Sequence, residues 1–392
     1  MHAQLTPAAS LPVDHDRAVL IGRMFDPDAR GPTLVRVTAN AVFELSSLAP
    51  TAAELFELRD PAAAVRATRD APQRFAFGDV LANSAFDRRD PARPCFLAPC
   101  DLQALKAAGV TFVASMLERV IEEQARGDPS KAESVRRAIV AIIGDNLRAV
   151  KPGSPEAARL KDALVRQGAW SQYLEVGIGP DAEIFTKSQP MSAVGTGAAI
   201  GIHPKSEWNN PEPEIVLAIN SRGEAVGATL GNDVNLRDFE GRSALLLGKA
   251  KDNNASCAIG PFVRLFDADF TMDDVRRAHL DMRVDGPDGF TLDGSSSIVE
   301  ISRDPLDLVS QAIGANHQYP DGFMLFLGTM FAPTKDRHGP GQGFTHVVGD
   351  IVTVRTPGLG ALVNRVDTSD RIAPWTFGSA ALMRNLASRG LL

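Results

Sequence analysis

Three carboxylates with a spacing suited to metal binding lie near the middle of the chain. Glu212 and Glu214 are separated by one residue, and each follows a proline. Residues two apart in an extended chain point to the same face, and a proline restricts the residue before it to extended conformations. The two glutamates are therefore expected on one face of a strand or of its lead-in.

A hairpin is expected to bring a third carboxylate to this pair. The apolar run 215–219 indicates a buried strand, turn residues follow at 220–223, and 225–230 indicates the returning strand, with Asp233 just beyond it. Three such ligands suit a hard divalent cation such as Mg²⁺, which accepts oxygen ligands and leaves positions for a substrate. The alternative is a rim of solvated carboxylates, since acidic residues are mostly exposed.

The sequence around these acids resembles the fumarylacetoacetate hydrolase superfamily. That family's pattern is E-x-E, then N-D-[VW]-[ST]-x-R-D-x-[QE], then a lysine before a G-P turn. The matching residues here are PEPE at 211–214, GNDVNLRDFE at 231–240, and Lys251 ahead of Gly260-Pro261. Within the superfamily the stretch 230–262 looks closest to bacterial 2-keto-3-deoxy-D-pentonate dehydratases. The likeness runs from about residue 100 to the C-terminus.

The resemblance implies a hydro-lyase of non-phosphorylative pentose oxidation. It would convert 2-keto-3-deoxy-D-pentonate, derived from D-xylonate or D-arabinonate, to 2-oxoglutarate semialdehyde. Glu212, Glu214 and Asp233 are the implied ligands of Mg²⁺, with Mn²⁺ or Ca²⁺ as substitutes. A cation held there would polarise the keto group and stabilise the enolate formed when a C3 proton leaves.

Lys251 falls where the family has its site lysine, and the resemblance implies that it abstracts the C3 proton or stabilises the enolate. A lysine that acts as a base near neutral pH needs a lowered pKa, which burial can supply. Lys249 is the competing assignment, and a structural ion pair is the alternative role for Lys251.

A further acid is expected on the helix predicted at 113–126. In hydrolase and decarboxylase relatives this segment carries a His and a Glu three residues apart, and those positions fall here on Ser115 and Glu118. Ser115 is then a substrate contact, and Glu118 is left to protonate the departing C4 hydroxyl. The alternative for Glu118 is a solvated helix face with local ion pairs.

Two other segments resemble substrate-binding parts of the family. Residues 182–192 resemble F-F-x-K-P-x-S, which makes Phe185, Lys187 and Ser192 candidates. Residues 319–329 resemble P-G-D-x-[IL]-x-x-G-T, and the backbone N–H and hydroxyl of Gly328-Thr329 would suit a substrate carboxylate.

Two other functions compete with the dehydratase. One is an acylpyruvate-type C–C hydrolase or oxaloacetate-type decarboxylase of the same superfamily, which Ser115 disfavours because the water-activating histidine is missing. The other is a carboxylate-lined binding module without catalysis. Three convergent acids, a lysine and a Gly-Thr pair together disfavour that reading.

Composition excludes several classes of protein. The 392 residues are 44% hydrophobic and 23% charged, as in soluble globular proteins. The net charge is −7 and no basic run occurs, so neither nucleic acid nor a membrane surface is an expected partner. Three cysteines without a C-x-x-C pair suit a reducing compartment. No signal peptide or membrane span is recognisable, and we expect a cytoplasmic protein.

The expected fold is α+β: a mainly β, mixed roll of the fumarylacetoacetate hydrolase C-terminal type with peripheral helices, plus a smaller β-containing N-terminal domain. We place the N-terminal domain at 1–98 and the catalytic domain at 99–392. The resemblance implies a homodimer or homotetramer acting on a small 2-keto-3-deoxy sugar acid. The pattern predicts strands at 18–25, 33–45 and 172–178, and helices at 130–147, 154–168, 304–314 and 375–389.

Overall fold

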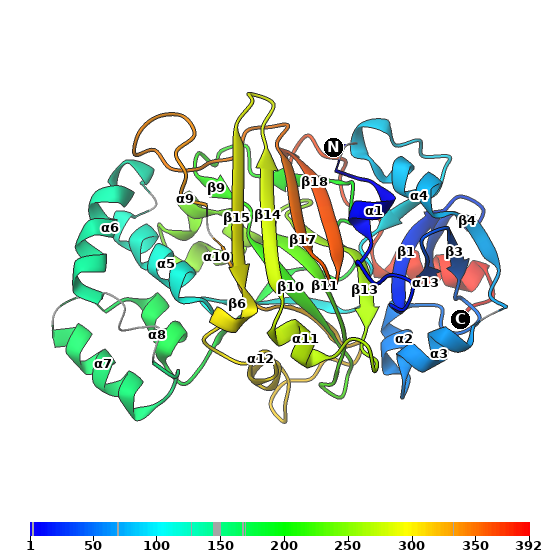
Figure 1. Cartoon of the computed structure of the whole chain (residues 1–392), viewed down its shortest axis with the longest axis horizontal. Helices are drawn as coiled ribbons and strands as arrows, with labels where there is room; N and C mark the ends of the chain where they lie inside the picture. The colour runs from blue at the N-terminus through cyan, green and yellow to red at the C-terminus, as the bar shows by residue number, and fades with distance from the viewer. Residues whose placement is uncertain are drawn as a thin grey trace.

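The computed structural model describes residues 1, 4–68, 70–126, 128–143, 150–166, 168, 170–331 and 333–392, and at 113–115, 129 and 138–143 it describes the backbone alone. The larger of its sheets runs in the order β4-β3-β2-β1-β13-β11-β10-β16-β6-β7, with β5 beside β1 (Figure 1). Its strands are β1 (Leu20–Asp26), β2 (Gly31–Val37), β3 (Ala41–Glu44), β4 (Gln73–Ala76), β5 (Cys95–Leu97), β6 (Ala104–Gly109), β7 (Glu183–Ser188), β10 (Pro213–Ile219), β11 (Ala225–Asp233), β13 (Cys257–Leu265) and β16 (Phe323–Phe326).

A second sheet packs against this one, and a short ribbon lies near the acidic residues. The second sheet has the order β15-β14-β17-β18-β8, and the ribbon pairs β12 with β9. Their bounds are β8 (Ala199–Ile202), β9 (Asn209–Asn210), β12 (Asn235–Leu236), β14 (His279–Asp285), β15 (Thr291–Ser297), β17 (Ile351–Thr356) and β18 (Gly360–Thr368).

Strand β10 is buried on both faces, which explains its unbroken apolar sequence. Ile215, Leu217 and Ile219 join a core cluster shared with β14, β17 and β18 of the second sheet. Val216 and Ala218 point the other way, into a cluster that contains residues of the N-terminal strands and helices. The hairpin carrying the acids is therefore held from both sides.

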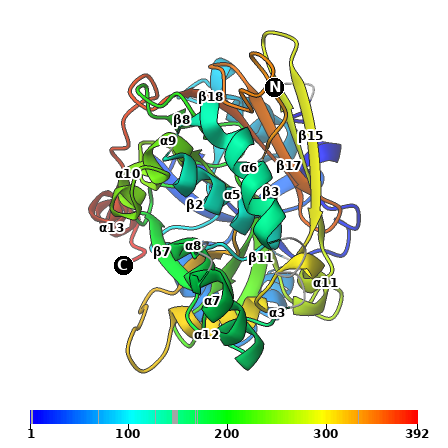
Figure 2. The same cartoon turned by 90° about the vertical axis from the view of Figure 1, so that its left-hand side faces the viewer.

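The helices gather at the two ends of the sheets. Helices α5 (Val113–Ala125), α6 (Pro129–Ile143), α7 (Pro155–Arg166) and α8 (Gln172–Ile178) form one group, which faces the viewer in Figure 2. Helices α2 (Ala52–Glu57), α3 (Pro61–Ala67), α4 (Phe77–Ser84) and α13 (Ser379–Ser388) lie at the opposite end with the N-terminal strands (Figure 1). The remaining helices are α1 (Pro7–Ser10), α9 (Arg237–Glu240), α10 (Leu247–Lys251), α11 (Met272–Arg276) and α12 (Pro305–Ala312).

The N-terminal strands β1 to β4 belong to the larger sheet, here called the central sheet. Strand β1 pairs with β13 at Leu20↔Arg264 and Ile21↔Val263, so hydrogen bonds cross the boundary expected at residue 98. The division into 1–98 and 99–392 stays a prediction. None of the helices in the described ranges is both long enough and apolar enough to cross a membrane.

One predicted strand is wrong, and two other predictions need adjustment. Residues 172–178 form α8, because the Ser171 side chain caps the Tyr173 N–H and Tyr173, Leu174 and Ile178 bury one helical face. The run 33–45 is split into β2 and β3. The C-terminal helix begins at Ser379 rather than at residue 375.

Candidate active site

The β10–β11 hairpin brings the three predicted carboxylates together. Pro213 pairs with Asn232 and Glu214 with Gly231, and the Asp233 N–H donates to the Glu212 carbonyl at 2.9 Å. Glu212, Glu214 and Asp233 each offer an oxygen within 4.8 Å of the others. All three side chains are buried, so the alternative of a solvated rim does not apply.

Positive side chains surround two of the three acids. The Lys251 ammonium lies 2.5 Å from the Glu212 carboxylate and 3.0 Å from that of Asp233. The Arg119 guanidinium binds the other oxygen of Glu212. Burial alone would raise the pKa of Glu212, but Arg119 and Lys251 lower that pKa to about 2. Glu212 is therefore ionised across the physiological range.

Among the described residues, no cationic side chain pairs with Glu214. Burial raises its pKa well above the usual range, and the neighbouring Asp233 and Glu212 carboxylates raise it further. Its closest donor is the Gly328 backbone N–H, 2.7 Å from Oε2. Gly328 has φ of +100°, a backbone conformation that favours glycine. An all-oxygen set in which one carboxylate lacks positive charge fits a divalent cation.

Lys251 does not have the lowered pKa expected for a base. Its burial acts in that direction, but Asp233 and Glu212 outweigh it and raise the pKa above the ordinary value for lysine. The lysine is therefore held as an ammonium. Lys249, the competing candidate, is exposed and lies over the Phe239 ring.

A small cavity of about 20 Å³ opens on these acids. Three other predicted residues line it, Phe185, Lys251 and Thr329, together with Arg119, Glu183 and Glu240. The Thr329 hydroxyl donates to the Phe331 carbonyl at 3.3 Å. The cavity brings a carboxylate set, cationic side chains and the Phe185 ring together at one point.

Several predicted site residues lie elsewhere. Lys187 is fully buried behind Asp233, outside the cavity lining. Ser192 bonds to the Ser188 hydroxyl at 2.7 Å and lines a different hollow. The Glu118 carboxylate pairs with Arg136 of α6 at 2.8 Å and does not line the cavity. The side chain of Ser115 lies outside the described part of the chain.

Glu183 is a site residue that the sequence reasoning missed. It opens β7 opposite Gly109, and a Cβ on Gly109 would lie 1.9 Å from the Glu183 carboxylate, so a larger residue at 109 would make the Glu183 side chain shift. Burial, with Glu240 nearby, raises the pKa of Glu183 to about 7. The alternation of side chains along a strand could have revealed Glu183, because residues 183, 185 and 187 share one face and the last two were predicted site residues.

Arg119 is the second residue that was missed. It lies one helical turn beyond Ser115 on α5 and joins Glu212 to a buried charge network. Its guanidinium lies 2.7 Å from Glu122 and 3.0 Å from Glu240, and Glu122 also pairs with Arg237 at 3.2 Å. These ion pairs join α5 to α9, and the Arg119–Glu212 pair joins α5 to the hairpin of β10 and β11 that carries the three acids.

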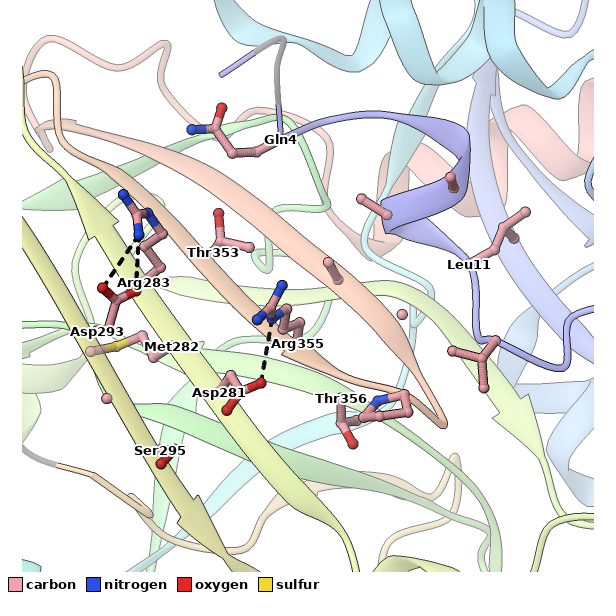
Figure 3. Close-up of a pocket in the computed structure, with 17 residues that line it drawn as sticks. Gln4, Leu11, Asp281, Met282, Arg283, Asp293, Ser295, Thr353, Arg355 and Thr356 are labelled. Carbon is pink, nitrogen blue, oxygen red and sulfur yellow. Dashed lines mark hydrogen bonds and ion pairs between the residues drawn. The ribbon is translucent and has the colours of Figure 1, made fainter.

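A larger hollow on the outer face of the second sheet lacks such a set. Figure 3 shows it between α1 and strands β14, β15 and β17. Its charged side chains pair with one another: Arg283 lies 3.1 Å from Asp293, and Arg355 lies 3.4 Å from Asp281. Within the described part of the chain, only Glu212, Glu214 and Asp233 form a convergent carboxylate set, so the cavity at Glu212 is the better candidate site.

Two curated proteins are similar to this chain in sequence. Over 199 residues the chain is 34% identical to the "Probable 2-keto-3-deoxyxylonate dehydratase" of Haloferax volcanii, covering 50% of this chain and 64% of that protein. It is 28% identical over 193 residues to the 2-dehydro-3-deoxy-D-arabinonate dehydratase of Saccharolobus solfataricus, covering 48% and 60%. The matched stretches thus span less than two thirds of either relative.

Solved structures confirm the expected fold. The apo form of a 2-keto-3-deoxy-D-arabinonate dehydratase aligns with a TM-score of 0.60 at 20% identity, over 89% of this chain and 99% of that one. The complex of such an enzyme with magnesium and 2,5-dioxopentanoate aligns equally well at 18% identity. Residues 163–367, just over half of the chain, match the fumarylacetoacetate (FAA) hydrolase C-terminal family. The chain therefore belongs to the fumarylacetoacetate hydrolase family.

Proposed function

We propose that this protein is a cation-dependent hydro-lyase that dehydrates 2-keto-3-deoxy-D-pentonate to 2-oxoglutarate semialdehyde. The observation that carries the proposal is the buried set Glu212, Glu214 and Asp233 with Lys251 at one cavity. These residues lie within the segment that matches the family. The names of the relatives with 34% and 28% identity support dehydration over hydrolysis.

The three carboxylates would hold Mg²⁺, with Mn²⁺ or Ca²⁺ as substitutes. Their oxygens suit a hard cation, and the unmet charge at Glu214 favours one. When bound, such an ion polarises a substrate carbonyl and stabilises negative charge that develops on its oxygen.

The protein's own side chains supply the remaining chemistry. Lys251, held as an ammonium, is placed to stabilise the negative charge on the keto oxygen as the C3 proton leaves. Glu183, with a pKa near 7, is suited to take that proton and to protonate the departing C4 hydroxyl. Thr329 lines the same cavity, and its hydroxyl would donate to the substrate carboxylate in place of the Phe331 carbonyl. Loss of water leaves a C3=C4 double bond conjugated to the keto group. Loss of a proton from C5 and protonation at C3 move the double bond to C4=C5, and the resulting enol tautomerises to the semialdehyde.

This assignment changes the acid expected on α5. Glu118 is engaged by Arg136, whereas Glu183 opens directly on the carboxylates. The catalytic role of Glu118 stays a prediction, and the two glutamates can be separated by mutation, as argued below.

The test is turnover of purified protein with Mg²⁺ and 2-keto-3-deoxy-D-xylonate, with the semialdehyde detected through a coupled dehydrogenase. We expect product formation that EDTA abolishes and Mg²⁺ restores, and that Glu214→Gln abolishes in a folded protein. Cleavage of an acylpyruvate or decarboxylation of oxaloacetate, without dehydration, would retain the metal site but replace the proposed activity.

A further inference from the structure

Lys187 is the most completely buried cationic group near the site, and no step above uses it. Its side chain has no exposed surface, and it is not among the described residues that line the cavity. An ammonium buried in this way needs several acceptors, because desolvation of a charge is costly unless it is paired and hydrogen-bonded. If the substrate were the acceptor, the Lys187 ammonium would have no partner between turnovers.

The acceptors around Lys187 come from three separate elements. Its Nζ lies 2.9 Å from Oδ1 of Asp233 at the end of β11, and it donates to the Val234 carbonyl at 3.4 Å. It also donates to the Lys251 carbonyl at the end of α10 and to the Ser256 hydroxyl, at 3.3 Å, just before β13. Ser256 in turn donates to the same Lys251 carbonyl at 2.7 Å.

Two lysines thus flank the Asp233 carboxylate: Lys251 forms a hydrogen bond with one oxygen, and Lys187 forms an ion pair with the other. Lys251 reaches Oδ2 at 3.0 Å from the cavity side, and Lys187 reaches Oδ1 from the buried side. Lys187 also fixes the backbone of Lys251 itself. One ammonium therefore ties a carboxylate of the acid set to the helix that presents the site lysine.

We propose that Lys187 is the positioning residue of this site: its buried ammonium fixes the Asp233 carboxylate and the end of α10, and so sets the cation affinity of the three acids. The inference rests on the cation in the proposed function, but not on the identity of the substrate. Groups that orient metal ligands from behind commonly change metal affinity by about 10–100-fold when they are lost.

The test is calorimetric titration of Mn²⁺ into metal-free full-length protein without substrate. We expect Lys187→Met, which keeps the length of the side chain and removes its charge, to weaken Mn²⁺ binding by about 10–100-fold. Lys106→Met is the charge control, because Lys106 lies on the adjacent strand β6 and, within the described part of the chain, bonds only to the Thr186 hydroxyl. It should bind Mn²⁺ as the wild type does.

A second control separates positioning from lost stability. Asn83→Ala removes buried hydrogen bonds to the carbonyls of residues 90, 93 and 94, far along the chain from the acids. It should lower the thermal midpoint in EDTA yet leave Mn²⁺ affinity unchanged. Wild-type Mn²⁺ affinity in Lys187→Met would overturn the proposal.

A double variant decides the case in which Lys187→Met fails to fold. Removing the lysine leaves a buried carboxylate short of one partner, and adding Asp233→Asn removes that charge. We expect the double variant to be soluble and to have a higher thermal midpoint in EDTA than Lys187→Met. A double variant no more stable or soluble than the single one would overturn the proposal. Altered Mn²⁺ affinity in a protein that dehydrates nothing would support Lys187 and reject only the proposed activity.

Discussion

At the scale of single residues, the two lysines of α10 offer a direct test of the site. Lys251 contacts Glu212 and Asp233, whereas Lys249, two residues earlier, is exposed over an aromatic ring. We expect Lys251→Ala to lower kcat by about 10²–10³-fold and Lys249→Ala to leave it within about twofold of the wild type. Steady-state kinetics with Mg²⁺ measure both. Equal losses in the two variants would remove Lys251 from the chemistry.

Glu183 predicts how stability depends on pH. Its folded pKa of about 7 lies above the unfolded value near 4.5, so the folded state binds the extra proton between these values. The wild type therefore loses stability as pH rises through this window, by roughly 3 kcal/mol at most. In EDTA we expect Glu183→Gln to be more stable than the wild type at pH 8, and the difference to shrink below about 1 kcal/mol at pH 5. Urea unfolding at the two pH values measures this, and a pH-independent difference would contradict it.

At the scale of elements, two glutamates compete for the role of catalytic acid: Glu118 on helix α5 and Glu183 on strand β7. Its Glu118 pairs with Arg136 of α6 at partly exposed positions, where an ion pair contributes about 0–1 kcal/mol. We expect Glu118→Gln to change kcat by less than about threefold, against about 10²–10⁴-fold for Glu183→Gln. Parallel kinetics on the two variants, with circular dichroism as the folding control, measure this. The reverse ranking would restore Glu118 as the acid that the family resemblance implied.

The elements also show how far sequence reasoning reached. The spacing of Glu212 and Glu214 and the returning strand predicted the acid hairpin, because strand alternation and turn residues are local signals. Arg119 and Glu183 reach the same cavity from α5 and β7, and only long-range packing places them there. The strand predicted at 172–178 is wrong because Ser171 caps the Tyr173 N–H and starts a helix there.

At the scale of the whole molecule, the central sheet decides whether the N-terminal part is separable. Ile21, Phe56 and Val65 share one core cluster with Val216 and Val263 of the central strands. The C-terminal helix also reaches back: Arg389 donates to the Pro32 carbonyl at 3.1 Å and lies 3.2 Å from Glu44. Deleting residues 1–98 would expose this cluster and leave β13 as an unprotected edge.

We therefore expect the fragment 99–392, produced alone, to be insoluble or to lack cooperative unfolding. Two measurements on the fragment and on the full chain test this. Loss of packing abolishes the near-ultraviolet circular dichroism signal and increases the binding of a hydrophobic dye. The control is the fragment 99–392 mixed with a separate 1–98 chain. If the fragment fails because it lacks the N-terminal strands of the sheet, adding them should restore cooperative unfolding. A soluble 99–392 that unfolds cooperatively and binds Mn²⁺ like the full chain would instead establish the two-domain division, with the N-terminal strands as an appended layer.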